Sequence, residues 1–157
     1  MFRFIIRRLA STAVLLEHTS TGLVKGNAAA IKAARKADKA SSVTGILISK
    51  DDKLAEAAKT LPGLSKLLLV KEDLNVGESA TTALKFIQEK FKFSHWFTVH
   101  STTGRDLFPR FSGILGSKQA TVADIINVTD ENTFIRPIYA GMLMNNFSYS
   151  PFRECNC

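Results

Sequence analysis

The chain has 157 residues, a length that suits one domain, and 45% of its residues are hydrophobic against 22% charged. This composition excludes a disordered, collagenous or low-complexity protein and is sufficient for a sizeable core. No apolar run approaches the roughly 18 residues that span a bilayer, so we expect no membrane insertion.

The net charge of +7 is unevenly distributed, because Arg3, Arg7 and Arg8 fall within an opening stretch that contains no acid. The rest of the chain is only moderately basic. It carries no basic stripe interleaved with aromatic residues and no zinc-finger or RNA-recognition signature. We therefore expect no nucleic-acid partner.

Residues 1–11 form an Arg-containing, acid-free segment that can fold as a short amphipathic helix. These features are typical of a mitochondrial transit peptide, and the sequence around Arg7-Arg8-Leu9-Ala10 suits cleavage by a matrix protease. An unremarkable basic N-terminus is the alternative. We expect the protein in the mitochondrial matrix.

Cysteine and histidine provide no recognisable metal site. Cys155 and Cys157 form a lone C-x-C pair, and the three histidines are spread along the chain without ligand spacing. We expect no metal and no disulfide framework, which agrees with a reducing compartment.

Short apolar strands alternate with amphipathic helices from the start of the predicted domain. Ala13–Glu17 predicts a buried strand and residues 18–22 a loop, after which Asn27 can cap a helix. Four alanines of this helix share one face: Ala30, Ala33, Ala34 and Ala37. Val43–Ser49 predicts the second strand.

The middle of the chain repeats this pattern. Asp51 and Asp52 predict a helix start, and Pro62-Gly63 ends that helix. Lys66–Lys71 predicts a third strand. Glu78–Phe91 predicts the clearest amphipathic helix, with a stripe formed by Ala80, Ala83, Leu84, Ile87 and Phe91.

His95–His100 predicts a fourth strand, and the loop 101–104 leads into another helix. If Asp106 caps that helix, Pro109 falls in its first turn, where a missing N–H costs little. Its apolar side carries Leu107, Phe111, Ile114 and Leu115.

The last predicted elements are extended. Ile125–Val128 predicts a fifth strand, a turn follows, and Thr133–Ala140 returns as an extended segment. Pro137 cannot donate to a ladder, so we expect this segment to be an edge strand or to carry a bulge. The alternation of strands and helices predicts an α/β fold with a parallel sheet covered on both faces.

The sequence lacks the common motifs of catalytic and phosphate-binding sites, and the remaining candidate residues have a simpler structural interpretation. The loop 18–22 has one glycine, no phosphate-binding P-loop or nucleophile elbow is present, and Asp51-Asp52 reads as a helix start. His18 follows the first strand at the edge where α/β proteins place ligands, but a loop hydrogen bond is the simpler interpretation. We therefore assign no catalytic, cofactor-binding or metal-binding residue.

Four segments in order resemble one family: residues 15–18 (LLEH), 101–110 (STTGRDLFPR), 122–126 (VADII) and 134–141 (FIRPIYAG). Over residues 12–141 the chain resembles the N-terminal domain of the electron transfer flavoprotein alpha subunit. The resemblance implies a three-layer sandwich similar to the adenine nucleotide alpha hydrolase-like fold. It also implies a heterodimer with the beta subunit and one FAD. The FAD takes electrons from acyl-CoA dehydrogenases to a ubiquinone oxidoreductase in fatty-acid beta-oxidation.

Residues 142–157 do not follow this resemblance and are expected to form a divergent tail. The family's FAD-binding C-terminal domain, with its Ser-Arg-Gly loop and its Gly-rich segment ending in Gln-His, has no counterpart in the sequence. We therefore expect a truncated form without a FAD of its own. We also expect an uncovered apolar edge at Thr133–Ala140 and a monomer prone to aggregate.

Three functions remain open: an alpha-type electron carrier that works only within a longer chain, a non-catalytic module that binds the beta subunit, and a small nucleotide-binding domain of universal-stress type. Arg110 and Arg136 each adjoin a proline that fixes the local backbone. Either arginine can contact the beta subunit or the missing domain, or can form a surface salt bridge or carbonyl cap.

Overall fold

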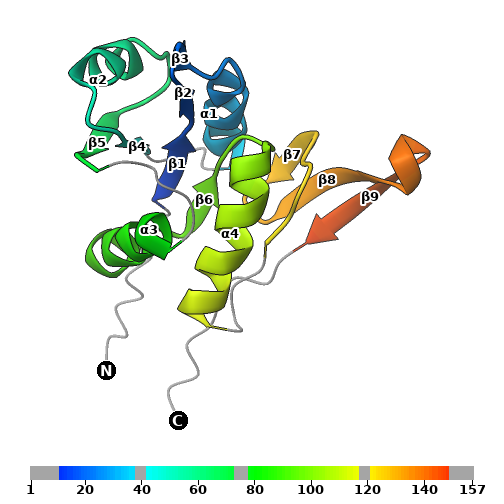
Figure 1. Ribbon diagram of the computed structural model, residues 1–157. Coiled ribbons are helices and arrows are strands. Elements are labelled where there is room, and N and C mark those ends of the chain that lie inside the picture. Colours follow the sequence, from blue (N-terminus) through cyan, green and yellow to red (C-terminus); the bar gives the residue numbers. More distant parts are fainter. Residues whose placement is uncertain (1–10, 38–41, 73–77, 117–120, 149–157) are drawn as a thin grey trace, which may run out of the picture.

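In the computed structural model, which describes residues 11–37, 42–72, 78–116 and 121–148, the chain folds into a three-layer α/β sandwich with a projecting antiparallel arm (Figure 1). The central sheet is parallel and has the order β5-β4-β1-β6. Its strands are β1 (Thr12–Leu16), β4 (Val43–Ile48), β5 (Lys66–Val70) and β6 (His95–Phe97). The predicted α/β class with a parallel sheet is confirmed.

Helices cover both faces of this sheet. On one face, α1 (Gly26–Ala37) and α2 (Asp52–Lys59) pack against Val14, Leu16 and Leu47. On the other face, α3 (Glu78–Phe91) and α4 (Thr102–Leu115) pack against the side chains that alternate with these, including Leu15 and Ile46. The inner strands β1 and β4 are buried along their whole length, because a parallel sheet covered on both faces leaves no side of a strand in water.

Two predicted helix starts are wrong. Asn27 lies inside α1 rather than capping it, and its buried side chain bonds to the backbone of Glu17. The cap of α4 is Ser101, whose Oγ accepts from the Gly104 N–H at 3.0 Å, so Pro109 lies in the helix interior. Both differences arise from contacts with Glu17. A local sequence pattern cannot predict them, because Glu17 is far from Ser101 in the sequence.

The predicted loop 18–22 contains a small hairpin, and one predicted strand is shorter. β2 (His18–Thr19) and β3 (Gly22–Leu23) pair antiparallel around a turn that ends at Gly22, whose φ of 144° suits glycine. β6 ends at Phe97, before the predicted end at His100.

The last part of the described chain forms a second, antiparallel sheet. Its strands are β7 (Asn127–Asp130), β8 (Thr133–Ile138) and β9 (Leu143–Ser148), with a short 3-10 turn, η1 (Tyr139–Gly141), between the last two. β8 is the central strand, so the predicted edge at Thr133–Ala140 is wrong, because β9 pairs with it and forms the edge. The alternative prediction was a bulge, and the β7–β8 ladder has one irregularity, a register shift on β7 between Val128 and Asp130. The pairing of β7 with β8 ends at Ile135, so no strand lies beside Pro137 on that side among the described residues. On the other side β9 pairs with β8 on both sides of Pro137.

We call β8, η1 and β9 the arm. Its base is held by Phe134, which is buried in the α1 side of the core, with its ring centroid 6.2 Å from that of Phe97. Beyond this base the arm projects away from the sandwich (Figure 1).

Within the described residues, no helix combines the length and the apolarity that crossing a membrane requires.

Candidate functional site

The carboxyl edge of the sheet is organised around Glu17, a carboxylate only 5% exposed at the end of β1. Its Oε1 accepts a 2.7 Å hydrogen bond from Ser101 Oγ and a longer one, 3.4 Å, from Thr98 Oγ1. Its backbone N–H donates to Asn27 Oδ1, and its carbonyl accepts from Asn27 Nδ2. One residue thus joins β1 to α1, to the chain after β6 and to the start of α4.

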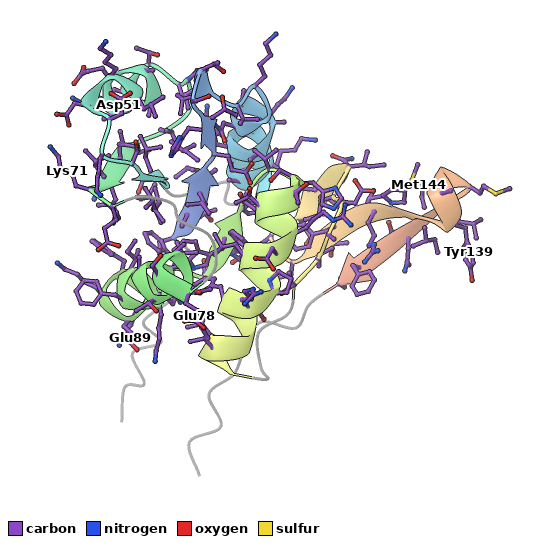
Figure 2. The ribbon with its side chains drawn as sticks, viewed as in Figure 1. Asp51, Lys71, Glu78, Glu89, Tyr139 and Met144 are labelled. Atoms are coloured by element: carbon purple, nitrogen blue, oxygen red, sulfur yellow. The ribbon has the colours of Figure 1, made fainter. Side chains whose placement is uncertain are left out.

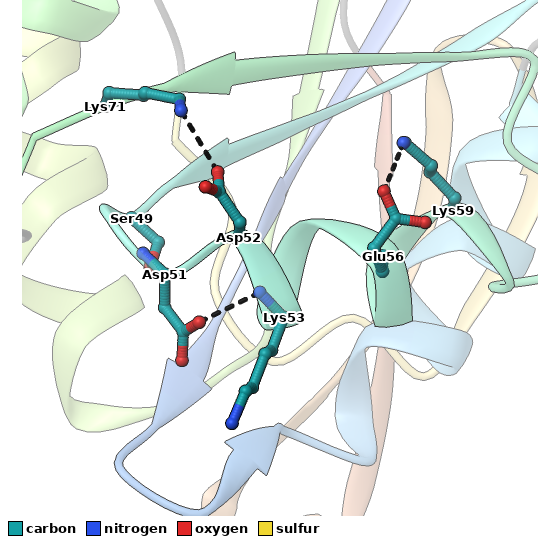
Figure 3. Close-up of polar contacts among 7 residues, drawn as sticks. All are labelled: Ser49, Asp51, Asp52, Lys53, Glu56, Lys59 and Lys71. Atoms are coloured by element: carbon teal, nitrogen blue, oxygen red, sulfur yellow. Dashed lines mark hydrogen bonds and ion pairs between the residues drawn. The ribbon is translucent and has the colours of Figure 1, made fainter.

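The N-termini of α2 and α4, two helices that start at this edge, are already capped by the chain's own polar groups. Asp51 Oδ1 accepts from the Lys53 N–H at 2.8 Å, while Asp52 pairs with Lys71 at 3.1 Å (Figure 3). This confirms that Asp51 starts a helix. The cap of α4 is tied to the carboxylate of Glu17. Because phosphates bind helix N-termini through free N–H groups and positive potential, acidic caps disfavour a phosphate at α2 and at α4.

His18, the histidine placed by sequence at the ligand edge, has a structural partner. Its Nε2 lies 2.9 Å from the carbonyl oxygen of Ile48, so this ring nitrogen donates and joins the ends of β1 and β4. The loop hydrogen bond expected from the sequence is therefore present. Among the described residues no group of three or more His, Cys, Asp or Glu lies close enough to hold a metal ion.

A cavity of about 620 Å³ lies beside β6 and the residues that follow it, and we call it the β6 crevice. Five consecutive residues, 96–100, line it on one side. The walls come from α1 on one layer, α4 on the other, and the segment 121–128. A volume of this size falls within the usual range of about 300–1,000 Å³ for ligand pockets.

The rim of the β6 crevice is mostly basic. Lys32, Lys36 and Arg105 lie on it, and Lys36 Nζ donates to Asn127 Oδ1 at 2.8 Å. The acid on the rim, Asp124, has its Oδ1 3.6 Å from His100 Nδ1. The sequence did not indicate this crevice, because it is assembled from four segments that only the fold brings together.

The arm carries four exposed large apolar side chains close together in the sequence. They are Tyr139 (74% exposed), Met142 (84%), Leu143 (55%) and Met144 (62%). Figure 2 shows Tyr139 and Met144 on its outer part, away from the helices of the sandwich. Clusters of exposed apolar side chains are common at interaction surfaces.

The two arginines chosen from the sequence have different environments. Arg110 Nε pairs with Asp106 Oδ1 at 3.0 Å on the exposed side of α4, which is the surface salt bridge that was one of the two interpretations. Arg136 lies on β8 with its guanidinium 5.9 Å from the ring centroid of Phe147. Its Nε is buried and has no hydrogen-bond partner among the described residues.

Comparison with known proteins gives the family. The model of the electron transfer flavoprotein domain matches residues 12–149, most of the chain. The chain belongs to the electron transfer flavoprotein family. The match continues beyond Gly141 and includes β9, within the segment that the sequence suggests is a divergent tail.

The similar curated proteins are alpha subunits. The chain is 34% identical over 151 residues to the probable electron transfer flavoprotein subunit alpha, mitochondrial, of Cryptococcus neoformans var. grubii. It is 31% identical to the corresponding protein of Schizosaccharomyces pombe and 26% identical to that of Arabidopsis thaliana. These alignments cover 92%, 86% and 96% of this chain but only 42%, 40% and 43% of the relatives. The chain thus spans about two fifths of their length.

Some expectations from the sequence lie outside the described residues or stay predictions. The suggested leader over residues 1–11 falls almost entirely outside them, and so do Cys155 and Cys157. The division of the chain at residues 11 and 141 stays a prediction.

A flavin does not fit the described residues on their own. Binding one requires donors for a pyrophosphate and groups that tune the ring. At the N-termini of α2 and α4 the carboxylates of Asp51 and Glu17 disfavour a pyrophosphate, and the β6 crevice has a largely apolar lining.

Proposed function

We propose that this chain acts as the N-terminal, scaffolding part of an electron transfer flavoprotein alpha-type subunit in the mitochondrial matrix. In this role it pairs with a beta-type subunit and has no enzymatic activity of its own. The complete complex then carries electrons on FAD from acyl-CoA dehydrogenases to the membrane-bound ubiquinone oxidoreductase in fatty-acid beta-oxidation. The FAD is held mainly by a part that these 157 residues do not contain.

The observation that carries this proposal is the exposed apolar arm within the family-matched region. Four large apolar side chains, from Tyr139 to Met144, project from a sandwich whose own core is already filled. Arg136, on the same arm, is half-buried, and the part of its guanidinium that reaches solvent can donate to a carboxylate or carbonyl of a bound subunit. Both features favour a partner protein at this surface.

A non-catalytic module that binds the beta subunit is the second candidate, and the same arm favours it. The two candidates differ in whether the complex needs a longer alpha-type chain to hold FAD. The nucleotide-binding alternative of universal-stress type has less support, because the family match and the acidic helix caps both disfavour it.

Co-expression with the beta-type subunit of the same genome tests the proposal. A tagged chain should co-purify the beta-type subunit, and the complex should lack the visible absorbance of a flavin. Fusing the missing part of a longer relative should restore that absorbance. The arm variant Leu143→Lys/Met144→Lys should lose the beta-type subunit. Phe86→Lys, which changes an equally exposed apolar residue on α3, should retain it.

Two results would contradict the proposal. One is a wild-type chain that captures no beta-type subunit although both proteins are folded. The other is a chain that purifies alone with stoichiometric flavin. A complex that forms but stays colourless even with the fused C-terminal part favours the non-catalytic module.

A further inference from the structure

The turn that joins β8 to β9 has a strained backbone. Tyr139, Ala140 and Gly141 are three consecutive residues with positive φ, at 51°, 53° and 87°. Glycine adopts this left-handed region readily, whereas in other residues the Cβ atom comes too close to the backbone. The hairpin therefore strains Tyr139 and Ala140, and an extended backbone at these two positions would relieve that strain.

β9 is held by backbone pairing with β8 rather than by burial of its own side chains. Five of its six residues are exposed, and none of them belongs to the two apolar clusters that form the core of the described residues. Phe134, in contrast, anchors β8 in the core. Separation of β9 from β8 would thus break a ladder of hydrogen bonds and leave the packing of the sandwich intact.

The register of the β8–β9 ladder is the same along its whole length. It runs through six residue pairs, from Thr133↔Ser148 to Ile138↔Leu143, without a shift. If β8 continued straight into β9, two copies of this long strand could lie antiparallel and keep all six pairs, now formed between chains. No bulge or slip is needed.

A straightened turn also adds contacts between the two copies. The same register sets Tyr139 of one copy opposite Met142 of the other, and Ala140 opposite Gly141, about a twofold axis. Tyr139 and Met142 are largely exposed in the hairpin, so this pairing would remove apolar surface from water. Because the arm projects from the sandwich, a second copy can approach it (Figure 1).

We infer that this chain forms a dimer by exchanging β9 with a second copy of itself. Each β9 pairs with β8 of the other copy, and residues 133–148 of the two copies form one continuous antiparallel ribbon. Exchange of an identical element preserves the pairs of that element and closes a twofold dimer, and a short strained turn favours it. The inference does not depend on docking of a beta-type subunit. It also differs from edge-to-edge addition along β9, in which each β9 stays on its own β8.

A disulfide between two chains tests the exchange. Thr133 Oγ1 and Ser148 Oγ lie 2.8 Å apart, so cysteines at these positions can form a disulfide where β8 and β9 pair. Two full chains are prepared in a Cys155→Ser/Cys157→Ser background, one with Thr133→Cys and a small tag, the other with Ser148→Cys and a larger tag. They are mixed, oxidised mildly and separated on a non-reducing denaturing gel. We expect a band that contains both tags and disappears on reduction.

Two variants of the turn should move the dimer equilibrium in opposite directions. Ala140→Gly relieves strain in the hairpin and should raise the Kd of the dimer at least about tenfold. Gly141→Val strains the hairpin, although the space around this glycine is open, and favours an extended turn, so the Kd should fall by a similar factor. Gly116→Val makes the same change at a positive-φ glycine with open space outside the arm and should leave the Kd unchanged. Sedimentation velocity measures each Kd.

Three outcomes would overturn the inference. A wild-type chain that remains monomeric up to about millimolar concentration forms no exchanged dimer. A dimer that gives no disulfide between the two tagged chains keeps each β9 on its own β8. Turn variants whose Kd changes no more than that of Gly116→Val show that strain in the turn does not drive the exchange.

Discussion

The buried carboxylate of Glu17 accepts a 2.7 Å hydrogen bond from the hydroxyl of Ser101, the residue that caps α4. The same hydroxyl accepts from the Gly104 N–H, so the end of β1 and the first turn of α4 share one hydrogen-bond chain. This contact fixes where α4 begins and closes its N-terminus to anions.

Removing either partner should destabilise the fold. Ser101→Ala deletes the helix cap and leaves the Glu17 carboxylate without its shortest hydrogen bond, which should lower the free energy of unfolding by about 1–2 kcal/mol. Glu17→Gln keeps an oxygen acceptor and should cost less than Glu17→Ala. Urea denaturation followed by Trp96 fluorescence measures these differences. Equal losses for Glu17→Gln and Glu17→Ala would show that the hydrogen bond contributes little.

Two glycines of α4 should respond in opposite directions to the same substitution. A Cβ on Gly104 would lie 2.3 Å from the Val99 carbonyl oxygen, so Gly104→Ala should destabilise the chain by about 1–3 kcal/mol. Gly113 has open space around its Cα, and Gly113→Ala should stabilise by about 0.5–1 kcal/mol through helix propensity. Thermal unfolding of the two variants, compared with wild type, measures both signs. A Gly104→Ala variant as stable as wild type would contradict the close approach of α4 to the chain after β6.

The strands and α3 could be predicted because their signals are local. β1 and β4 are apolar runs buried on both faces, β5 is a partly buried apolar run, and Glu78–Phe91 coincides with α3. On α3 the predicted stripe is confirmed for Ala80, Leu84 and Ile87, while Phe91 is exposed. Burial of one face at helical spacing is enough to reveal such elements.

The start of α4 and the order of the antiparallel sheet could not be predicted, because they depend on partners far along the chain. Pro109 suggests a helix that starts nearby, but the contact between Ser101 and Glu17 moves the start upstream. Pro137 suggests an edge strand, yet β8 is central and β7 simply ends before Pro137. The β6 crevice has no sequence signal, because segments far apart in the sequence line it.

Arg136 should matter for binding more than for stability. Its Nε is buried without a partner among the described residues, and its guanidinium lies over Phe147. Arg136→Met keeps the apolar contact and removes the desolvated donor, so the free energy of unfolding should stay the same or rise by up to about 1 kcal/mol. Affinity for the beta-type subunit, measured by calorimetry, should fall about tenfold if the solvent-facing part of the guanidinium donates to a subunit acceptor. Arg110→Met, which breaks an exposed pair, should change neither quantity appreciably. A loss of stability in Arg136→Met without a loss of affinity would assign Arg136 a purely structural role.

The arm should also make the isolated chain self-associate. β9 is an edge strand with exposed Leu143 and Met144, and such an edge offers unpaired backbone groups beside apolar side chains. Met144→Lys places a charge on this edge and should shift sedimentation toward monomer while changing the free energy of unfolding by no more than about 0.5 kcal/mol. Phe86→Lys removes an exposed apolar residue of α3 and should leave self-association unchanged, because a helix has no unpaired strand edge to which a second copy could add. Sedimentation velocity over a range of concentrations distinguishes the two variants. Two results would show that self-association does not occur through β9. One is a wild-type chain that stays monomeric at every concentration, and the other is a Phe86→Lys variant that dissociates as readily as Met144→Lys.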